Sequence, residues 1–193
     1  MKVRVAVAQA LMAAGGLMVT GAALVGFGGA WLESRDRAQL EARLETAGPA
    51  TELTPAAEVS APARDLGILR LDRLGWSVVI RPSDSEYDLS RGVGWIRGTA
   101  LPGADGNSAI AGHRDTYFRV LRHVKRGDTF RLKTEHGVRT YVVQKTLIVN
   151  PDDVAVLQPD SRSALTLVTC YPFDLIGHAP QRFIVKAAMK KGP

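Results

Sequence analysis

The segment 166-TLVTCYPF-173 contains the only cysteine of the chain, Cys170, at the end of an apolar and β-branched run. Such a run before a Tyr-Pro turn predicts a strand that ends at the thiol. A cysteine at the end of a strand is either a buried small hydrophobic residue or a reactive thiol. The choice depends on the cellular compartment and on which other residues fold back to meet it.

Short runs with strand character continue on both sides of this segment, separated by Gly, Pro and Asp-Gly turn signals. The predicted strands are residues 67–71, 76–80, 107–112, 128–133, 138–149, 164–170 and 182–188. Only 115-DTYFRVLRHV-124 predicts a short amphipathic helix, with Phe118, Leu121 and Val124 on one face. Seven or eight short strands with one or two short helices predict a mainly β fold, a closed and largely antiparallel barrel of about eight strands.

The N-terminal part predicts a transmembrane helix. Val5 to Leu32 is a run of 28 residues without a charge. At about 1.5 Å per residue it exceeds the roughly 30 Å hydrocarbon core, and it is longer than the apolar region of a secretory signal, about 7–15 residues. Six glycines dilute its hydrophobicity and Gly28-Gly29-Ala30 is similar to a cleavage site. Cleavage as a signal peptide therefore stays the alternative to an uncleaved anchor.

The charges that flank this run predict its orientation. Lys2 and Arg4 favour an N-terminus inside the cell, although Arg35 and Arg37 weaken the asymmetry. Nearly all of the chain follows the anchor, so we expect a single-pass, type II protein of the cell membrane with its folded domain outside the cytoplasm. A single cysteine has no disulfide partner within the chain, and we expect Cys170 to be a free thiol.

Three regions are predicted along the chain: the membrane anchor at 1–32, a helical stalk with a Pro/Ala-rich linker at 33–65, and the folded domain at 66–193. The stretch 33-ESRDRAQLEARLE-45 has helix-forming composition and is expected to extend the helix into solvent. Residues 46–65 are rich in Pro, Ala and Thr without periodicity, which is typical of a semi-rigid spacer. Such a spacer would let the folded domain reach away from the lipid surface.

The composition excludes some classes of function. The net charge of +6 is mildly basic, without a Lys/Arg stripe or interleaved aromatic residues. This argues against nucleic-acid binding and favours an anionic surface such as the cell envelope. One cysteine and dispersed histidines do not have the spacing of a zinc site.

A nucleophilic cysteine needs a base or a cation nearby, because the thiolate is the reactive form. Surface positions explain His123 and His136, whereas His178, in the loop after Cys170, is a real competitor for the role of base. His113 ends an apolar run and begins a polar segment. A histidine at the end of a buried strand is well placed to face a cysteine at the end of another.

Arg182 opens the last predicted strand, twelve residues after Cys170. If 164–170 and 182–188 are neighbouring strands, the guanidinium returns close to the thiol. Its planar fork of donors suits a developing oxyanion or a bound carbonyl. By spacing alone, a surface arginine on an edge strand is the somewhat better explanation.

These segments together resemble the motifs of the sortases, the membrane-anchored cysteine transpeptidases of bacterial envelopes. 166-TLVTC-170 matches the TLxTC signature, 106-GNSAIAGHRDTYFRVL-121 resembles the histidine motif, and Arg182 in 180-PQRFIV-185 resembles the arginine. The resemblance covers about residues 66–188, and the N-terminal anchor agrees with it. The form TLVTCYPF, with GTALPGADGNSAIAGHRDTYF, is most similar to class D sortases and the related Gram-negative type.

The resemblance implies a sortase-type β-barrel and a division of labour among three catalytic residues. Cys170 attacks the carbonyl carbon of a threonine in an LPxT-like sorting signal and forms a thioacyl enzyme. His113 protonates the departing amine and then takes a proton from the incoming one. Arg182 stabilises the oxyanion or fixes the substrate backbone. Transfer and hydrolysis both remain open as outcomes.

Further residues are expected to bind substrate. Thr169, through its hydroxyl and backbone, is expected to line the groove or the oxyanion site, with Val168 and Ala111 as further substrate-binding residues. Asp115, two residues after His113, is placed to orient the imidazole, but strand alternation or a helix cap explains it equally well, and we do not count it as catalytic. Some sortases use calcium, but a solvated loop explains the acidic residues between 152 and 160 equally well. We expect no metal and no cofactor.

The implied partners are a protein with an LPxT-like C-terminal sorting signal and an amine acceptor linked to the envelope or the peptidoglycan. Two other functions stay open. An L,D-transpeptidase acting on peptidoglycan would carry a His-Gly-Cys type cluster, whereas Thr169 and Tyr171 flank Cys170. A membrane-tethered binding module with a structural thiol would keep its function in Cys170→Ala and would resist alkylation.

Overall fold

The computed structural model describes residues 37–42, 44–45, 64–159 and 163–190. The predicted membrane anchor, residues 1–32, lies outside the described residues, as does most of the predicted linker. Within the described ranges, no helix is long and apolar enough to cross a membrane.

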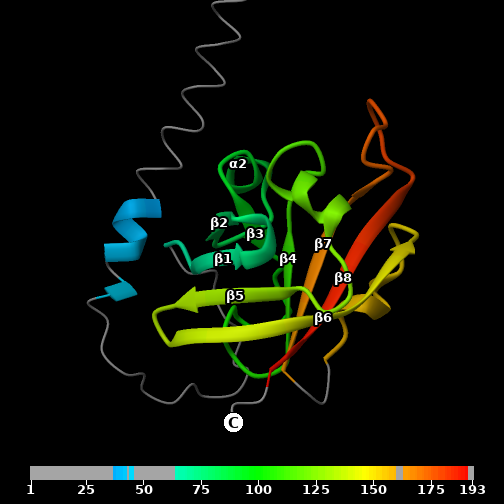
Figure 1. The fold of residues 1–193 in the computed structure, drawn as a ribbon. Coiled ribbons are helices and arrows are strands. Elements are labelled where there is room, and N and C mark those ends of the chain that lie inside the picture. The colour runs from blue at the N-terminus through cyan, green and yellow to red at the C-terminus, as the bar shows by residue number, and fades with distance from the viewer. Residues whose placement is uncertain (1–36, 43, 46–63, 160–162, 191–193) are drawn as a thin grey trace, which may run out of the picture. The chain divides into compact units, whose positions relative to one another are not determined.

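Eight strands close into a barrel (Figure 1). They are β1 (Gly67–Leu71), β2 (Trp76–Arg81), β3 (Val93–Trp95), β4 (Asn107–Ala111), β5 (Thr129–Thr134), β6 (Gly137–Val149), β7 (Ala164–Tyr171) and β8 (Gln181–Met189). Their order around the barrel is β1-β2-β3-β4-β7-β8-β6-β5. Neighbours are antiparallel except for the pairs β2–β3 and β4–β7, which are parallel. The prediction of a mainly β, closed barrel of about eight strands is confirmed.

Alternate side chains from the strands fill the barrel, as the period of two in a β-strand requires. On β7, Leu165 and Leu167 belong to this core and have no exposed surface. Each large apolar side chain buried in this way contributes about 1.5–3 kcal/mol. Because successive side chains point to opposite faces, the alternate residues Thr166, Val168 and Cys170 lie on the outer face of β7.

Two elements differ from the sequence-based expectation. β3 was not predicted, because three residues in a glycine-rich segment are too few to show alternation. A Cβ on Gly94 would come within 2.1 Å of the Ser83 carbonyl oxygen, so this close approach requires glycine. The helix predicted at 115–124 is a shorter 3-10 helix, η2 (Tyr117–His123). Its core residues Phe118 and Leu121 are three apart, a spacing that brings side chains into line in a 3-10 helix.

The remaining short helices lie in the connections of the barrel: η1 (Asp72–Leu74), α2 (Glu86–Leu89) and η3 (Val154–Leu157). The number of short helices is therefore larger than predicted. All of them are one or two turns long, and their composition is too varied for a helical period to emerge from the sequence.

The described residues before position 46 are helical, as their composition predicts (Figure 1). Leu40 and Leu44 are buried in a cluster with Ile68 of β1 and Val79 of β2. Leucines four residues apart lie on one face of a helix, and here that face covers apolar side chains on the outside of the barrel. The expectation that this segment extends into solvent is therefore wrong for these two leucines. The predicted boundaries at residues 32 and 65 stay predictions.

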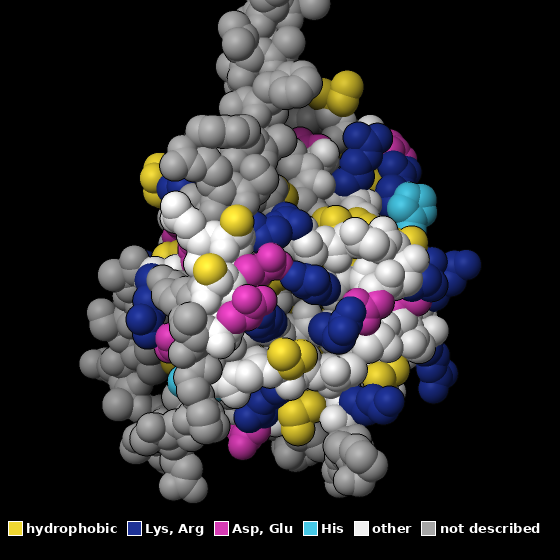
Figure 2. All heavy atoms as spheres, turned by 60° about the vertical axis from the view of Figure 1, so that its left-hand side comes forward, with side chains coloured by type: hydrophobic (Ala, Val, Ile, Leu, Met, Phe, Trp, Pro, Cys, Tyr) yellow, Lys and Arg dark blue, Asp and Glu magenta, His cyan; other side chains and the backbone are white. Residues whose placement is uncertain are grey.

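Charged side chains of both signs are interspersed on the face shown in Figure 2, where apolar side chains occur singly among the described atoms. Ion pairs of this kind include Arg131 with Asp72 at 2.5 Å and Arg139 with Asp105 at 2.8 Å. Such a mixed surface is typical of a soluble domain and forms no continuous basic stripe on this face.

Candidate active site

Two neighbouring strands carry Cys170 and Arg182. β7 and β8 are antiparallel, and their register makes these two residues direct partners. Side chains of residues directly opposite each other lie on the same face of a sheet, with Cβ atoms about 4.5–5.5 Å apart. The sequence placed Arg182 near the thiol only if the strands of these two residues were neighbours. That condition is confirmed.

His113 reaches the same place from a third strand. β4 runs parallel to β7, with Ala111 as the partner of Val168. The amide of Gly112 donates a hydrogen bond to the Val168 carbonyl oxygen at 3.1 Å, which extends the pairing by one residue. Continued by one more step, this register brings His113 beside Cys170.

Cys170 is a free cysteine with a partly exposed side chain. It lies on the outer face of β7, together with the partly exposed Val168, and Ala111 of β4 is also partly exposed. The barrel core contains neither these residues nor the thiol. The alternative that Cys170 is a small hydrophobic residue of the core is therefore wrong.

The side chains of two predicted catalytic residues, His113 and Arg182, contact other polar groups. His113 Nε2 lies 3.4 Å from Glu86 Oε1. Arg182 Nη1 donates to the carbonyl oxygens of Ala179 at 3.3 Å and Gln181 at 3.0 Å. The backbone brings the three residues together, and rotation of their side chains has to complete the contacts. Catalytic hydrogen bonds commonly tighten only when substrate binds.

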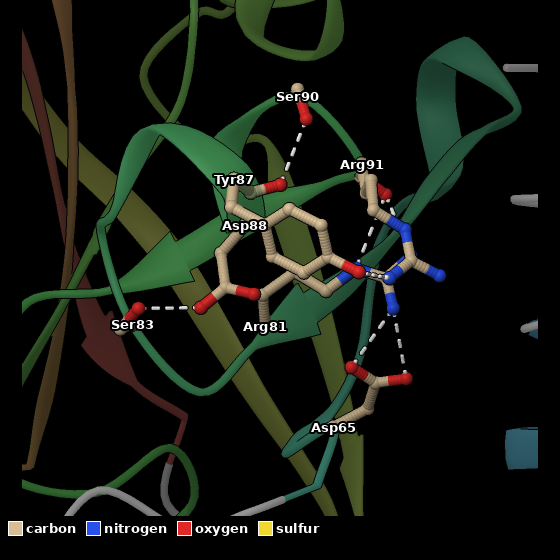
Figure 3. Close-up of polar contacts among 7 residues, drawn as sticks. All are labelled: Asp65, Arg81, Ser83, Tyr87, Asp88, Ser90 and Arg91. Atoms are coloured by element: carbon tan, nitrogen blue, oxygen red, sulfur yellow. Dashed lines mark hydrogen bonds and ion pairs between the residues drawn. The ribbon is translucent and has the colours of Figure 1, made fainter.

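Glu86 is a residue that the sequence analysis missed. It lies in the first turn of α2, and its side chain is 84% exposed. Ser85 caps this helix, its hydroxyl accepting a hydrogen bond from the Asp88 amide at 3.3 Å. The Ser83 hydroxyl donates to Asp88 Oδ2 at 2.5 Å (Figure 3). No local signal distinguishes Glu86 from other exposed acidic residues.

A buried arginine fixes the segment that carries α2. Nη1 of Arg81 donates to both carboxylate oxygens of Asp65, at 3.0 and 3.1 Å, and Nη2 donates to the Arg91 carbonyl oxygen at 2.8 Å (Figure 3). Arg91 in turn donates to the Tyr87 hydroxyl at 2.8 Å. Both ends of the segment are thereby held to the barrel, which fixes the backbone from which the exposed Glu86 side chain reaches His113.

The other histidines lie away from this strand register. His123 ends η2, and His136 lies in the turn between β5 and β6. His178 lies in the loop between β7 and β8, and all three are exposed. Asp115 is also exposed, and within the described ranges it makes no hydrogen bond to His113. The geometry therefore favours His113 over the other three histidines as the catalytic base.

The Thr169 hydroxyl is buried and donates a hydrogen bond to the Gly112 carbonyl oxygen at 2.6 Å. It fastens β7 to the strand that leads into His113, so in this structure the hydroxyl does not line a groove. Contact of the Thr169 backbone with a substrate stays a prediction, as do the binding roles of Val168 and Ala111.

A polar network closes the outer face further along β7. Lys186 Nζ donates to the Val156 carbonyl oxygen at 2.7 Å and to the Thr166 hydroxyl at 2.9 Å. The Thr166 hydroxyl donates to Asn107 Oδ1 at 2.6 Å, and the Asn107 amide donates to Val156 at 3.2 Å. These bonds hold η3 against β4, β7 and β8. The accessible strip on the outer face therefore lies between η3 and Cys170.

Two other features lie elsewhere. A cavity of about 90 Å³, lined in part by Leu66, Thr134 and His136, includes none of the predicted site residues.

Over the described residues, no group of three His, Cys, Asp or Glu side chains is arranged to hold a metal ion. Asp153 serves as the N-cap of η3, accepting from the Ala155 amide at 3.3 Å.

Comparisons with known proteins agree on one family. The family model for the sortase domain matches residues 69–190. Sortase D of Bacillus subtilis (strain 168) is 36% identical over 120 residues, which is 62% of this chain and 61% of that protein. The alignment thus spans less than two thirds of that relative.

Solved structures show the same fold. The sortase D5 transpeptidase of Clostridium perfringens has a TM-score of 0.66 at 21% identity, covering 82% of this chain and 98% of that one. Sortase C of Streptococcus pneumoniae has a TM-score of 0.63 at 23% identity, with 82% and 88% covered. Sortase C-1 of Actinomyces oris has a TM-score of 0.62 at 23% identity, with 82% and 98% covered.

Proposed function

Because this chain belongs to the sortase family, we propose that it is a cysteine transpeptidase that cleaves an LPxT-like sorting signal and transfers the product to an amine. The observation that carries the proposal is the strand register, in which Cys170 is the partner of Arg182 and β4 leads His113 to the same place. The similarity to Sortase D supports assignment to class D.

The proposed reaction begins at the thiolate of Cys170, which attacks the carbonyl carbon of the scissile amide. The guanidinium of Arg182 donates hydrogen bonds to the oxyanion that develops on the carbonyl oxygen. His113 gives a proton to the departing amine, and the carbon–nitrogen bond breaks to leave a thioester on Cys170.

The second half of the reaction releases the thioester. An acceptor amine attacks the same carbonyl carbon while the imidazole of His113 takes its proton, and the carbon–sulfur bond breaks to restore the thiolate. Dividing one amide exchange into two steps at one carbonyl lowers each barrier, provided that the reacting groups are held close together.

The substrate chain is proposed to lie along the outer face of β4 and β7. Ala111 and Val168 are register partners there, are partly exposed, and share the face with Cys170. Their small apolar side chains suit the apolar residues of an LPxT-like sequence. The network around Lys186 and η3 is proposed to close this strip at the end remote from the thiol.

We also propose that the protein is anchored in the cell membrane with its barrel on the outer side. The support is the uncharged run from Val5 to Leu32, with Lys2 and Arg4 before it. This location would place the thiol next to envelope substrates and acceptor amines.

The test is incubation of the full-length chain with a library of LPxTx peptides, followed by mass spectrometry of the protein. We expect an acyl adduct on Cys170 that candidate amines release. Cys170→Ala and His113→Ala should form no adduct and keep the thermal stability of the wild type. The exposed Arg119, replaced by Gln, is a matched control that should react normally.

Two results would contradict the proposal. A wild-type chain that forms no adduct with any peptide of the library would argue against the reaction. Resistance of Cys170 to iodoacetamide, together with unchanged ligand binding in Cys170→Ala, would favour the membrane-tethered binding module instead.

A further inference from the structure

The loop of residues 172–180 connects Cys170 to Arg182 and carries an apolar tip. Leu175 is 42% exposed, and Ile176 is 98% exposed. A fully exposed isoleucine gains nothing from burial, so its position depends on what holds the loop.

Arg114, the residue directly after His113, holds the loop. Its Nη2 atom donates hydrogen bonds to the carbonyl oxygens of Leu175 and Gly177, each at 2.6 Å. These two carbonyls bracket Ile176. Gly177 adopts a φ of +92°, a backbone conformation that glycine reaches without steric cost.

Burying the Arg114 guanidinium costs free energy of hydration, so it is an expensive way to stabilise a loop. Arg114 is only 9% exposed, and within the described ranges no carboxylate pairs with it. Its Nη1 atom is buried and has no hydrogen-bond partner among those same residues. Two neutral carbonyl oxygens accept hydrogen bonds from this buried guanidinium, but no opposite charge offsets its loss of hydration. Stability of the fold alone therefore does not account for Arg114.

The contacts of Arg114 connect two catalytic residues. On one side the backbone joins it to His113. On the other side it holds the loop whose Ala179 carbonyl oxygen accepts a hydrogen bond from Arg182 Nη1, at 3.3 Å. Arg122 forms a second ion pair with this loop, to Asp174 at 2.8 Å. This pair is more exposed, and exposed ion pairs contribute little free energy of stabilisation.

We propose that Arg114 is a positioning residue, which fixes the loop 172–180 to the His113 segment and thereby sets the place of Arg182 relative to the imidazole. This inference rests on the proposed transpeptidase function. Arg114 acts through Arg182 and the loop and has no contact with the reacting atoms. Preorganisation of this kind affects the rate of the chemical step more than the affinity for substrate.

The first test compares Arg114→Gln with Arg119→Gln in the full-length chain. Arg119 is an exposed arginine of η2 and serves as the matched control. Amide hydrogen exchange across 174–181 should be faster in Arg114→Gln and unchanged in the control. For thioacyl formation, kcat should fall about tenfold to a hundredfold, the range for lost charge-assisted hydrogen bonds, with KM changing less. Arg114→Lys, which retains the charge, should recover part of the rate.

The second test is a double-mutant cycle with Arg182→Ala. If Arg114 acts through Arg182, then Arg114→Gln should cause little further loss of rate when Arg182→Ala is already present. Fully additive losses would overturn the proposal, and so would loop exchange and kcat at wild-type values in Arg114→Gln. If Arg114→Gln does not fold, the same cycle and exchange measurement are made with Arg114→Lys.

The outcomes separate this inference from the proposed function. A wild-type chain that forms no thioacyl adduct overturns the proposed function, whatever the loop does. Unchanged exchange in the loop of a folded Arg114 variant overturns the fastening by Arg114, even when the wild type is fully active.

Discussion

Cys170 and Arg182 are direct partners across the antiparallel strands β7 and β8, so one sheet position unites a thiol and a guanidinium that are far apart in the sequence. The parallel pairing of β4 with β7 adds His113 to the same place. The proposed chemistry depends on these two pairings.

Replacing Arg182 by Lys should lower kcat/KM for thioacyl formation by roughly 10²–10³-fold, as expected for loss of an oxyanion donor. A lysine keeps the positive charge but loses the planar fork of donors. In the present structure Nη1 of this arginine donates to the carbonyl oxygens of Ala179 and Gln181. Stopped-flow or quenched mass spectrometry would measure the rate. A fall of less than threefold would argue against an oxyanion role, and Arg119→Lys is the control.

Thr169→Val should destabilise the barrel by about 1–3 kcal/mol, because it leaves the buried Gly112 carbonyl oxygen without its hydroxyl donor. It should also slow thioacyl formation, because this bond joins the strands of His113 and Cys170. Urea unfolding and peptide turnover would be measured side by side. Thr129→Val, in the half-buried start of β5, should change neither quantity by much.

Lys186→Met should loosen η3 while keeping most of the apolar stem of the side chain. The ammonium group bonds to Val156 and Thr166, and its loss removes charge-assisted bonds that are typically worth about 1.5–3 kcal/mol each. Amide exchange at residues 154–158 should accelerate. Equal exchange in Lys186→Met and in the exposed control Lys145→Met would contradict a fastening role for Lys186.

Acid should weaken the barrel partly through Asp128. The hydrogen bond from Arg73 lowers the pKa of this carboxyl and outweighs burial, which acts in the opposite direction. Since the folded-state pKa is below the unfolded value of about 3.9, the stabilisation is complete well above pH 4 and is lost as the pH falls. Asp128→Asn should therefore be less stable at pH 7 and should lose less free energy of unfolding between pH 5 and pH 2.

Chemical denaturation across this pH range would test the Asp128 prediction. Asp84→Asn removes an exposed carboxylate from the loop before α2 and is the matched control. The same acid dependence in wild type and Asp128→Asn would show that other carboxyl groups dominate acid unfolding.

Tyr141→Phe should keep or raise stability, by up to about 1 kcal/mol, because the variant lacks a buried hydroxyl that has no partner among the described residues. Burial also raises the pKa of Tyr141. A raised folded-state pKa means that stability is complete below the unfolded pKa of about 10 and is lost as the pH rises further. The variant should therefore lose less stability than the wild type above pH 10, as measured by urea unfolding at pH 7 and pH 10.5.

Most of the barrel was predictable from local sequence patterns. Seven of the eight strands match predicted runs to within one residue, because alternation and β-branched residues report directly on a half-buried strand. β3 was not predicted, because only two of its residues pair with each neighbouring strand and so short a segment shows no periodic pattern. The helix against β1 and β2 had the right composition, but its partners Ile68 and Val79 are recognisable only from the closed barrel.

The chemical groups of the site are readable from the amino-acid order: one thiol at the end of a strand, a histidine after another, and an arginine at the start of a third, in an order that resembles one family. The groups that surround them become known from the folded chain. Glu86 reaches His113, Arg114 holds the loop before Arg182, and the Thr169 hydroxyl is buried between strands. The physical reason is that strand character arises from neighbouring residues, whereas these polar contacts join residues brought together by strand register and barrel closure.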